Sequence, residues 1–172
     1  MPSRRDPIQS ELMQGRTFSS RREEVLLSLL RTGAIARRLP ARVVETHGLS
    51  LAQYNVLRIL RQAGDEGLAT LAIRGLMIEE AAGITRLIDK LEAAGLVRRD
   101  RSADDRRRVV CRITEEGLST ITKLDDSILR ACEAALEMLD DADMDDLTRL
   151  LELIRSRHKQ AGATGEEELR VG

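Results

Sequence analysis

The chain has 172 residues, a formal net charge of −1 and an apolar share of 42%, which suits one domain, or one small domain with helical extensions. Charged residues make up 33% of the sequence, which argues against a membrane protein, and no apolar run approaches the roughly 20 residues that span a bilayer. Aromatic residues make up only 1%, so the core must be built from aliphatic side chains, which favours packed helices over a β-sandwich.

No catalytic or metal site stands out in the sequence. The two cysteines have no paired spacing, and His47 and His158 are isolated, so we expect neither a disulfide framework nor a bound metal or cofactor. We find no nucleophile–base pair or phosphate-binding loop, which argues against an enzyme. The basic N-terminus lacks the apolar stretch of a signal peptide, so we expect a cytoplasmic protein with no membrane partner.

The N-terminal part of the chain is predicted to be helical after a polar arm. Residues 1–20 show little periodicity and are interpreted as a flexible arm. Apolar residues then recur at helical spacing over 21–47. Pro40 either kinks this helix or begins a second helical segment over 40–47.

The middle of the chain predicts three helices of different lengths. Ser50 is expected to cap the first, which Gly64 ends. A short helix follows over 70–76. The third is predicted over 79–95, with two glutamates in its first turn, where carboxylates favour the helix dipole.

Two short strands and further helices are predicted for the rest of the chain. The strands are "LVRRDR" and "RRRVVCRIT", joined by the turn-rich linker "SADDR". Thr114 followed by Glu115 to Gly117 indicates a helix start, and apolar stripes predict two helices that form the C-terminal part over 118–160. The polar tail over 161–172 is expected to be disordered.

Charge is strongly polarised along the chain. Nine basic and five acidic residues lie between residues 86 and 112, a local net charge of +4. Eight acidic residues and one arginine lie between residues 133 and 152, a local net charge of −7. Near-zero total charge therefore does not exclude a nucleic-acid partner, because the local field decides such binding.

The order of the middle elements, a short helix, a longer helix and a β-hairpin, is that of a winged helix-turn-helix. A helix fills the major groove of DNA, and its N-terminal half reaches the base edges. A hairpin beside it carries arginines to phosphates or into the minor groove, whose negative potential attracts them. The arginine-rich hairpin suits this use.

The run "GITRLIDKLEAAGLVRRDRSADDRRRVVCRITEEG" resembles the recognition helix and wing of the multiple-antibiotic-resistance regulator (MarR) family. The family pattern "TRL-[IV]-D-[RK]-LE-x-x-GLV-x-R" matches over 85–97, and its "R-x-x-x-x-D-x-R" wing matches Arg101, Asp105 and Arg107. The "LTxxG" restart matches Ile113-Thr114 with Gly117. Upstream, "GLSLAQYNVLRIL" resembles the family's "GLTxxQxxVLxxL" helix.

The resemblance implies a mostly α (α+β) fold and a homodimer. A winged helix-turn-helix lobe over 48–117 would lie between an N-terminal dimerisation helix over 21–47 and C-terminal dimerisation helices over 118–160. Each lobe would read half of a pseudo-palindromic operator, with half-sites about one DNA turn apart. The wide apolar faces of the flanking helices point independently to a partner.

For the wing, the resemblance implies that Arg107 enters the minor groove and that Asp105 orients it through a charge-assisted bond. Arg106 and Arg108 alternate around Arg107 and are expected to contact phosphates. Arg101 is expected to brace the wing or contact the DNA backbone. The alternative for these residues is a solvated hairpin tip.

On the predicted recognition helix, Arg86 is the best candidate for a bidentate contact to guanine, and Thr85 for a base or phosphate contact. Ala82 and Gly83 are small enough to let the helix approach DNA closely. The alternative is an ordinary polar helix face.

Two further side chains are interpreted as structural. Tyr54 is expected to be mainly core. Cys132 lies on an apolar stripe and is expected to be a buried small hydrophobe. The exposure of Cys111 stays open.

We therefore expect a sequence-specific, DNA-binding transcription regulator, most simply a ligand-responsive repressor that acts as a homodimer. A small anionic or aromatic effector would bind between the dimerisation helices and the lobe and alter the spacing of the two recognition helices. No residue identifies the effector. The alternative is a helical dimeric interaction protein that has lost DNA binding.

Overall fold

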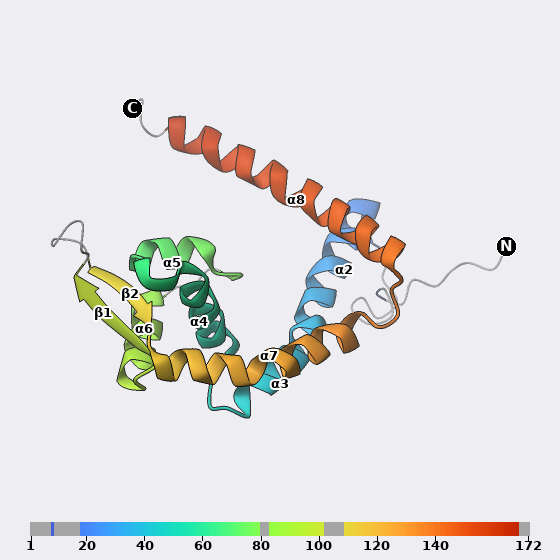
Figure 1. Ribbon diagram of the computed structural model, residues 1–172. Coiled ribbons are helices and arrows are strands. Elements are labelled where there is room, and N and C mark those ends of the chain that lie inside the picture. Colours follow the sequence, from blue (N-terminus) through green and yellow to red (C-terminus); the bar gives the residue numbers. More distant parts are fainter. Residues whose placement is uncertain (1–7, 9–17, 80–82, 102–108, 169–172) are drawn as a thin grey trace. The chain divides into compact units, whose positions relative to one another are not determined.

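The computed structural model describes residue 8 and residues 18–79, 83–101 and 109–168. The chain divides into two compact units, residues 1–135 and residues 136–172, which we describe separately. The first unit holds several helices and one antiparallel β-hairpin (Figure 1). The predicted mostly α fold with a winged helix-turn-helix is confirmed.

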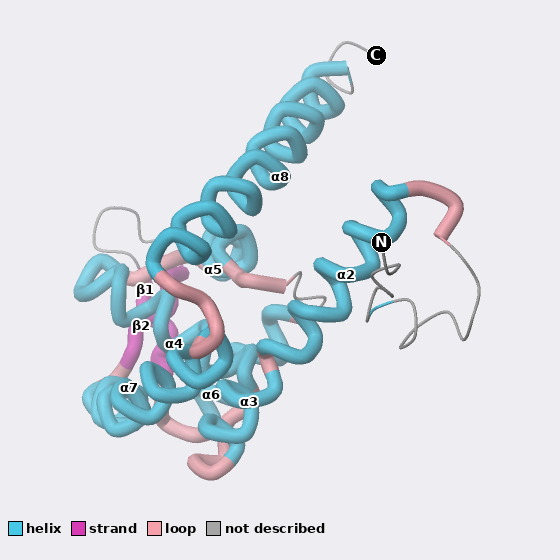
Figure 2. Tube along the Cα trace, turned by 90° about the vertical axis from the view of Figure 1, so that its right-hand side faces the viewer, coloured by secondary structure: helices cyan, strands magenta, loops and turns pink. Residues whose placement is uncertain are grey.

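The first unit begins with two helices separated at one residue. Helix α2 spans Arg21–Ala36, and the Ser20 side chain caps it by accepting a hydrogen bond from the Glu23 amide. Helix α3 spans Arg38–Glu45, and a short loop marks the break (Figure 2). Pro40 has no N–H to donate to the Ala36 carbonyl, which accounts for the break. The predicted second segment therefore exists, but it begins at Arg38 rather than at Pro40, which is tolerated in a first helical turn.

Helix α4, Leu51–Ala63, is the central helix of the core. Ser50 and Gln53 form a capping box at its start, and Gly64 ends it, as predicted. Six of its residues are buried, namely Tyr54, Asn55, Val56, Leu57, Ile59 and Leu60. The expectation that Tyr54 belongs to the core is thus confirmed. A 3₁₀ turn, η1 (Gly64–Glu66), and helix α5 (Thr70–Leu76) follow.

Helix α6 spans Ile84–Ala93 and is shorter than the helix predicted over 79–95. Gly83 precedes it with φ +101°, a left-handed conformation that a right-handed α-helix cannot include. Glu79 therefore lies in a bend before the helix and not in its first turn. Ile84, Ile88 and Leu91 form the buried face of α6.

The β-hairpin consists of β1, Val97–Arg101, and β2, Val109–Ile113, which pair antiparallel with Val97 opposite Ile113. The backbones of Leu68 and Cys111 exchange two hydrogen bonds, 3.0 and 2.8 Å long, which tie β2 to the segment before α5. Cys111 is fully buried there. Strand β2 is thus anchored to the segment before α5.

Helix α7 spans Glu115–Leu136 and starts where the sequence predicts a helix. The Thr114 hydroxyl accepts a hydrogen bond from the Gly117 amide at 3.0 Å and donates one to the Gly95 carbonyl at 2.7 Å. Gly117, whose amide this cap binds, packs closely on the turn before β1, because a Cβ on Gly117 would lie 2.2 Å from the Leu96 carbonyl oxygen. The start of α7 is therefore fastened to the turn that follows α6.

The second half of α7 corrects one expectation. Buried residues of α7 lie in its first half, at Gly117, Ile121 and Leu124. Cys132 is exposed and not buried as predicted, because the apolar stripe on which it lies extends past the part of α7 that packs on the lobe.

The second unit contains helix α8, Asp141–Glu168, which the Asp140 carboxylate caps by accepting from the Asp143 amide. The helix includes residues 161–168, which the sequence analysis assigned to a disordered tail. Its apolar side chains are largely exposed within the single chain, namely Met144, Leu147, Leu150, Leu153 and Ile154. No described helix is long and apolar enough to cross a membrane.

Candidate DNA-binding surface

The outward face of α6 carries the predicted base-reading residues. Ile84 and Ile88 fix which side of α6 faces the core. Successive residues turn by about 100°, so Arg86 projects from the opposite side and Thr85 from its flank. Both side chains are exposed, as is Gly83. The structure thus brings Thr85, Arg86 and Gly83 together at the start of one exposed helix.

Of the other residues predicted to contact DNA, the structure describes only Arg101. Ala82, Asp105, Arg106, Arg107 and Arg108 lie outside the described residues, so their roles stay predictions. Arg101 is exposed at the end of β1, opposite Val109.

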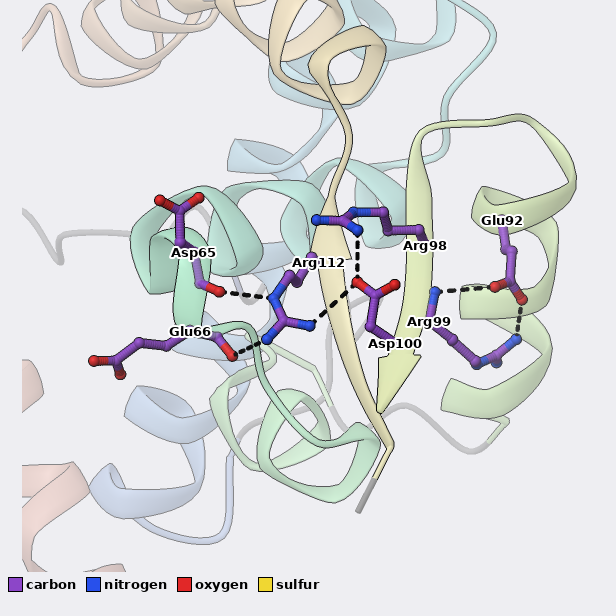
Figure 3. Close-up of polar contacts among 7 residues, drawn as sticks. All are labelled: Asp65, Glu66, Glu92, Arg98, Arg99, Asp100 and Arg112. Atoms are coloured by element: carbon purple, nitrogen blue, oxygen red, sulfur yellow. Dashed lines mark hydrogen bonds and ion pairs between the residues drawn. The ribbon is translucent and has the colours of Figure 1, made fainter. Parts of the chain in front are cut away.

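Arg99 joins the hairpin to the C-terminal half of α6. Its backbone amide donates to Glu92 Oε1 at 3.1 Å, and its guanidinium pairs with the carboxylates of Glu92 and, at 2.6 Å, Asp89 (Figure 3 shows the Glu92 contacts). Burial lowers the pKa of the guanidinium, but the hydrogen bonds to Asp89 and Glu92 outweigh this effect and raise the pKa. Arg99 is therefore committed to holding the wing against α6.

Arg112 fastens the hairpin on its other side. Its Nε donates to the Asp65 carbonyl at 2.7 Å, its Nη2 to the Glu66 carbonyl at 3.3 Å, and its Nη1 to Asp100 Oδ2 at 3.1 Å (Figure 3). Arg98 reaches the same Asp100 oxygen at 3.0 Å, but its side chain is 60% exposed, against 16% for Arg112. Arg112 therefore braces β2 against η1, while Arg98 lies at the surface.

These contacts divide the arginines of the hairpin into those that hold it in place and those that are exposed. Arg99 and Arg112 are structural, and sequence reasoning missed this role. One signal was available, because Asp89 and Glu92 are three residues apart and share a helix face. The side chains of four basic residues of the lobe have no hydrogen-bond or ion-pair partner within the described ranges, namely those of Arg74, Arg86, Lys90 and Arg101. These four side chains are free to attract phosphates.

An apolar cavity of about 710 Å³ lies among α2, α4, α7 and the segment before α6. Leu29, Leu30 and Ile128 contribute apolar wall, and Arg37 and Arg58 contribute positive charge. A smaller cavity of about 310 Å³ adjoins it and shares Arg37 in its lining.

Tyr54 also lines the larger cavity. Burial, together with the negative charge of Asp125, raises the pKa of its phenol. Asp125 on α7 is held by Arg61 on α4 at 2.8 Å, and this hydrogen bond raises the pKa of Arg61. This ion pair joins α4 to α7, two of the helices that line the cavity.

Comparisons with known proteins agree with this geometry. A family model described as the MarR family matches residues 49–109. A MarR transcription factor of known crystal structure from Planctomyces limnophilus is 37% identical, with a TM-score of 0.59, over 80% of this chain and 99% of that one. The homoprotocatechuate degradative operon repressor of Escherichia coli is 24% identical over 148 residues, 85% of this chain and 99% of that protein.

The fold also recurs in Bordetella bronchiseptica BpsR, whose structure is 20% identical with a TM-score of 0.68 and covers 77% of this chain and 99% of that one. The two-strand wing, the exposed α6 and the matched family model lead to one assignment. The chain belongs to the MarR family of DNA-binding transcription regulators.

Proposed function

We propose that this regulator is a ligand-responsive repressor that binds a pseudo-palindromic operator as a homodimer. The observation that carries the DNA-binding role is the start of α6, where Arg86 projects away from the core without a partner among the described side chains. A guanidinium held in this way is available to the paired acceptors on the major-groove edge of guanine. In this proposal α6 reads the bases.

Exposed apolar side chains support the homodimer. On α2, Val25, Leu26 and Leu30 are 50 to 60% exposed, and α8 has a comparable exposed apolar series. A soluble protein normally covers faces of this kind. A second copy of the chain, with its own α2 and α8, would cover them and would place two α6 helices to read two half-sites.

The cavity supports the effector. The Escherichia coli relative is named as a repressor of a homoprotocatechuate degradative operon, and the BpsR structure is described as explaining regulation of DNA binding by 6-hydroxynicotinic acid. Such a hydroxylated aromatic acid offers an apolar ring and an anionic group. The cavity offers apolar walls beside Arg37 and Arg58, which matches the expected small anionic or aromatic effector.

Operator binding tests the proposal. The purified chain should bind an inverted repeat upstream of its own gene, and log affinity should fall with log salt by about 0.9 per neutralised phosphate. Replacing Arg86 with alanine should cost about 1–3 kcal/mol and relax specificity at one base pair. Arg130→Ala, an exposed change on α7, is the matched control and should leave binding unchanged.

The alternative, an interaction protein without DNA binding, makes the opposite prediction. Its affinity for any such DNA would be absent even at low salt. An Arg86→Ala variant that binds the operator as tightly as the natural chain would also refute the assignment of α6 to base reading.

A further inference from the structure

An ion pair joins the helix break to the segment that enters α6. The Arg37 guanidinium, between α2 and α3, binds the carboxylate of Glu79, which lies 42 residues further along the chain. Both residues line the larger cavity and also the smaller one. The pair therefore stands at the boundary between the two cavities.

The Arg37–Glu79 pair joins a guanidinium to a carboxylate, which is the contact that a carboxylate ligand would also make with Arg37. Glu79 is the sole carboxylate among the described residues that line the larger cavity. The guanidinium of Arg37 is thus occupied by an acid of the chain itself. A carboxylate from outside would make the same charge-assisted hydrogen bonds, so the two acids compete for one receptor.

A buried amide beside this pair has unused donor capacity. Asn55 is only 4% exposed and lines both cavities. Its Oδ1 accepts from Arg58 at 3.0 Å, whereas among the described residues the Nδ2 group has only the thioether sulfur of Met77 as a partner, at 3.7 Å. A thioether is a weak acceptor, so an oxygen of a ligand would be the better partner for Nδ2.

We propose that Arg37 is the carboxylate receptor of the effector cavity and that Glu79 is its internal competitor. The inference rests on the proposed function, because it takes this cavity as the effector site. The ligand class is a small carboxylic acid with an apolar body, and Asn55 Nδ2 donates to a second oxygen of that ligand.

Exchange of the two carboxylates would reach the DNA-binding helix directly. Glu79 lies shortly before Gly83, the left-handed residue at which α6 begins. Binding of the ligand acid to Arg37 releases Glu79, whose ion pair with Arg37 joins the described chain before α6 to the break between α2 and α3. The side chains of Arg37 and Glu79 are 55% and 64% exposed, so the pair contributes little stability and opens readily. A weak internal contact is what a switch needs if a small ligand is to displace it.

The test uses benzoate as the probe and benzamide as its uncharged counterpart, with the full chain and calorimetric titration. Replacing Glu79 with glutamine removes the competitor and should tighten benzoate binding about two- to fivefold. Replacing Arg37 with glutamine removes the receptor and should weaken it at least about tenfold. Arg38→Gln, an exposed neighbour that lines neither cavity, is the matched control and should change nothing. Circular dichroism of each variant checks that it folds.

The outcomes separate the exchange from the proposed function, because operator affinity is measured in parallel with and without benzoate. Benzoate binding that Glu79→Gln leaves unchanged or weakens overturns the exchange, and so does an absence of benzoate binding. If benzoate changes operator affinity equally in all variants, the effector function stands and the exchange fails. If the variants show the expected order of benzoate affinity but operator binding never responds, the exchange stands and the ligand-responsive repressor fails.

Discussion

Arg112 offers a direct measure of what holds the wing in place. Its side chain is 16% exposed, and replacing it with alanine removes the bonds to two backbone carbonyls of η1 and to Asp100. The 2.7 Å charged bond to the Asp65 carbonyl contributes about 1.5 kcal/mol, and the partly buried pair with Asp100 adds about 1 kcal/mol. We expect Arg112→Ala to lower the free energy of unfolding by about 2–3 kcal/mol.

The matched control is Arg98→Ala, because Arg98 pairs with the same Asp100 oxygen from a surface position. That change should cost about 0–1 kcal/mol. Urea denaturation followed by circular dichroism gives both values, at one fixed chain concentration because an oligomer's stability depends on it.

Operator binding distinguishes bracing from phosphate contact. Arg112→Ala should weaken binding by misplacing the wing, and the slope of log affinity against log salt should stay the same. The reasoning is refuted if Arg98→Ala costs as much stability as Arg112→Ala. It also fails if the salt slope of Arg112→Ala drops by about one, since Arg112 would then be neutralising a phosphate.

Three further predictions use single positions. Gly117→Ala places a Cβ 2.2 Å from a backbone oxygen and should destabilise the fold by about 1–3 kcal/mol in thermal denaturation, whereas Gly75→Ala, which meets open space, should not destabilise it. Tyr54 is the only tyrosine, and its pKa is raised by burial and by a nearby carboxylate, so phenolate absorbance should appear above the ordinary pH range for tyrosine. Because the folded chain holds this proton more tightly than the unfolded chain, stability should fall as pH rises above about 10, and Tyr54→Phe should remove that fall. Leu26→Glu should convert a dimer to monomers in sedimentation, while Leu71→Glu, at a similarly exposed site on α5, should not; equal behaviour of the two would contradict the assigned interface.

Local sequence signals predicted most of the elements, and they failed where a single backbone conformation or a single missing donor decided the outcome. The caps at Ser50 and Thr114 were readable because their side chains act within a few residues. The true start of α6 depends on the left-handed conformation of Gly83, which the helical spacing around it conceals. Pro40 predicts a break in the helix, but the break lies three residues earlier, at Arg37. The reason is that the hydrogen bond that Pro40 cannot donate is the one to the Ala36 carbonyl.

The candidate site could be predicted by residue type but not by partner. Thr85 and Arg86 were identified from a local pattern and are exposed at the start of α6. Arg112 looked equivalent to its neighbours, because its partners Asp65 and Glu66 are far away in sequence and act through backbone carbonyls. The prediction that Cys132 is buried is wrong, because an apolar stripe along a helix does not show how far the rest of the lobe covers that helix.

The two hydrogen bonds of the Thr114 hydroxyl affect how α6 and α7 can move relative to each other. It binds the Gly95 carbonyl after α6 and the Gly117 amide in α7, so the two helices are coupled through one side chain at their junction. Helix α7 has 22 residues, which corresponds to a rod of about 33 Å. A tilt of about 5° at one end of such a rod displaces the other by about 3 Å. Because Thr114 fastens the first end of α7 to the turn after α6, a change in tilt displaces the distal half of α7 most, while α6 shares the rotation and little of the displacement.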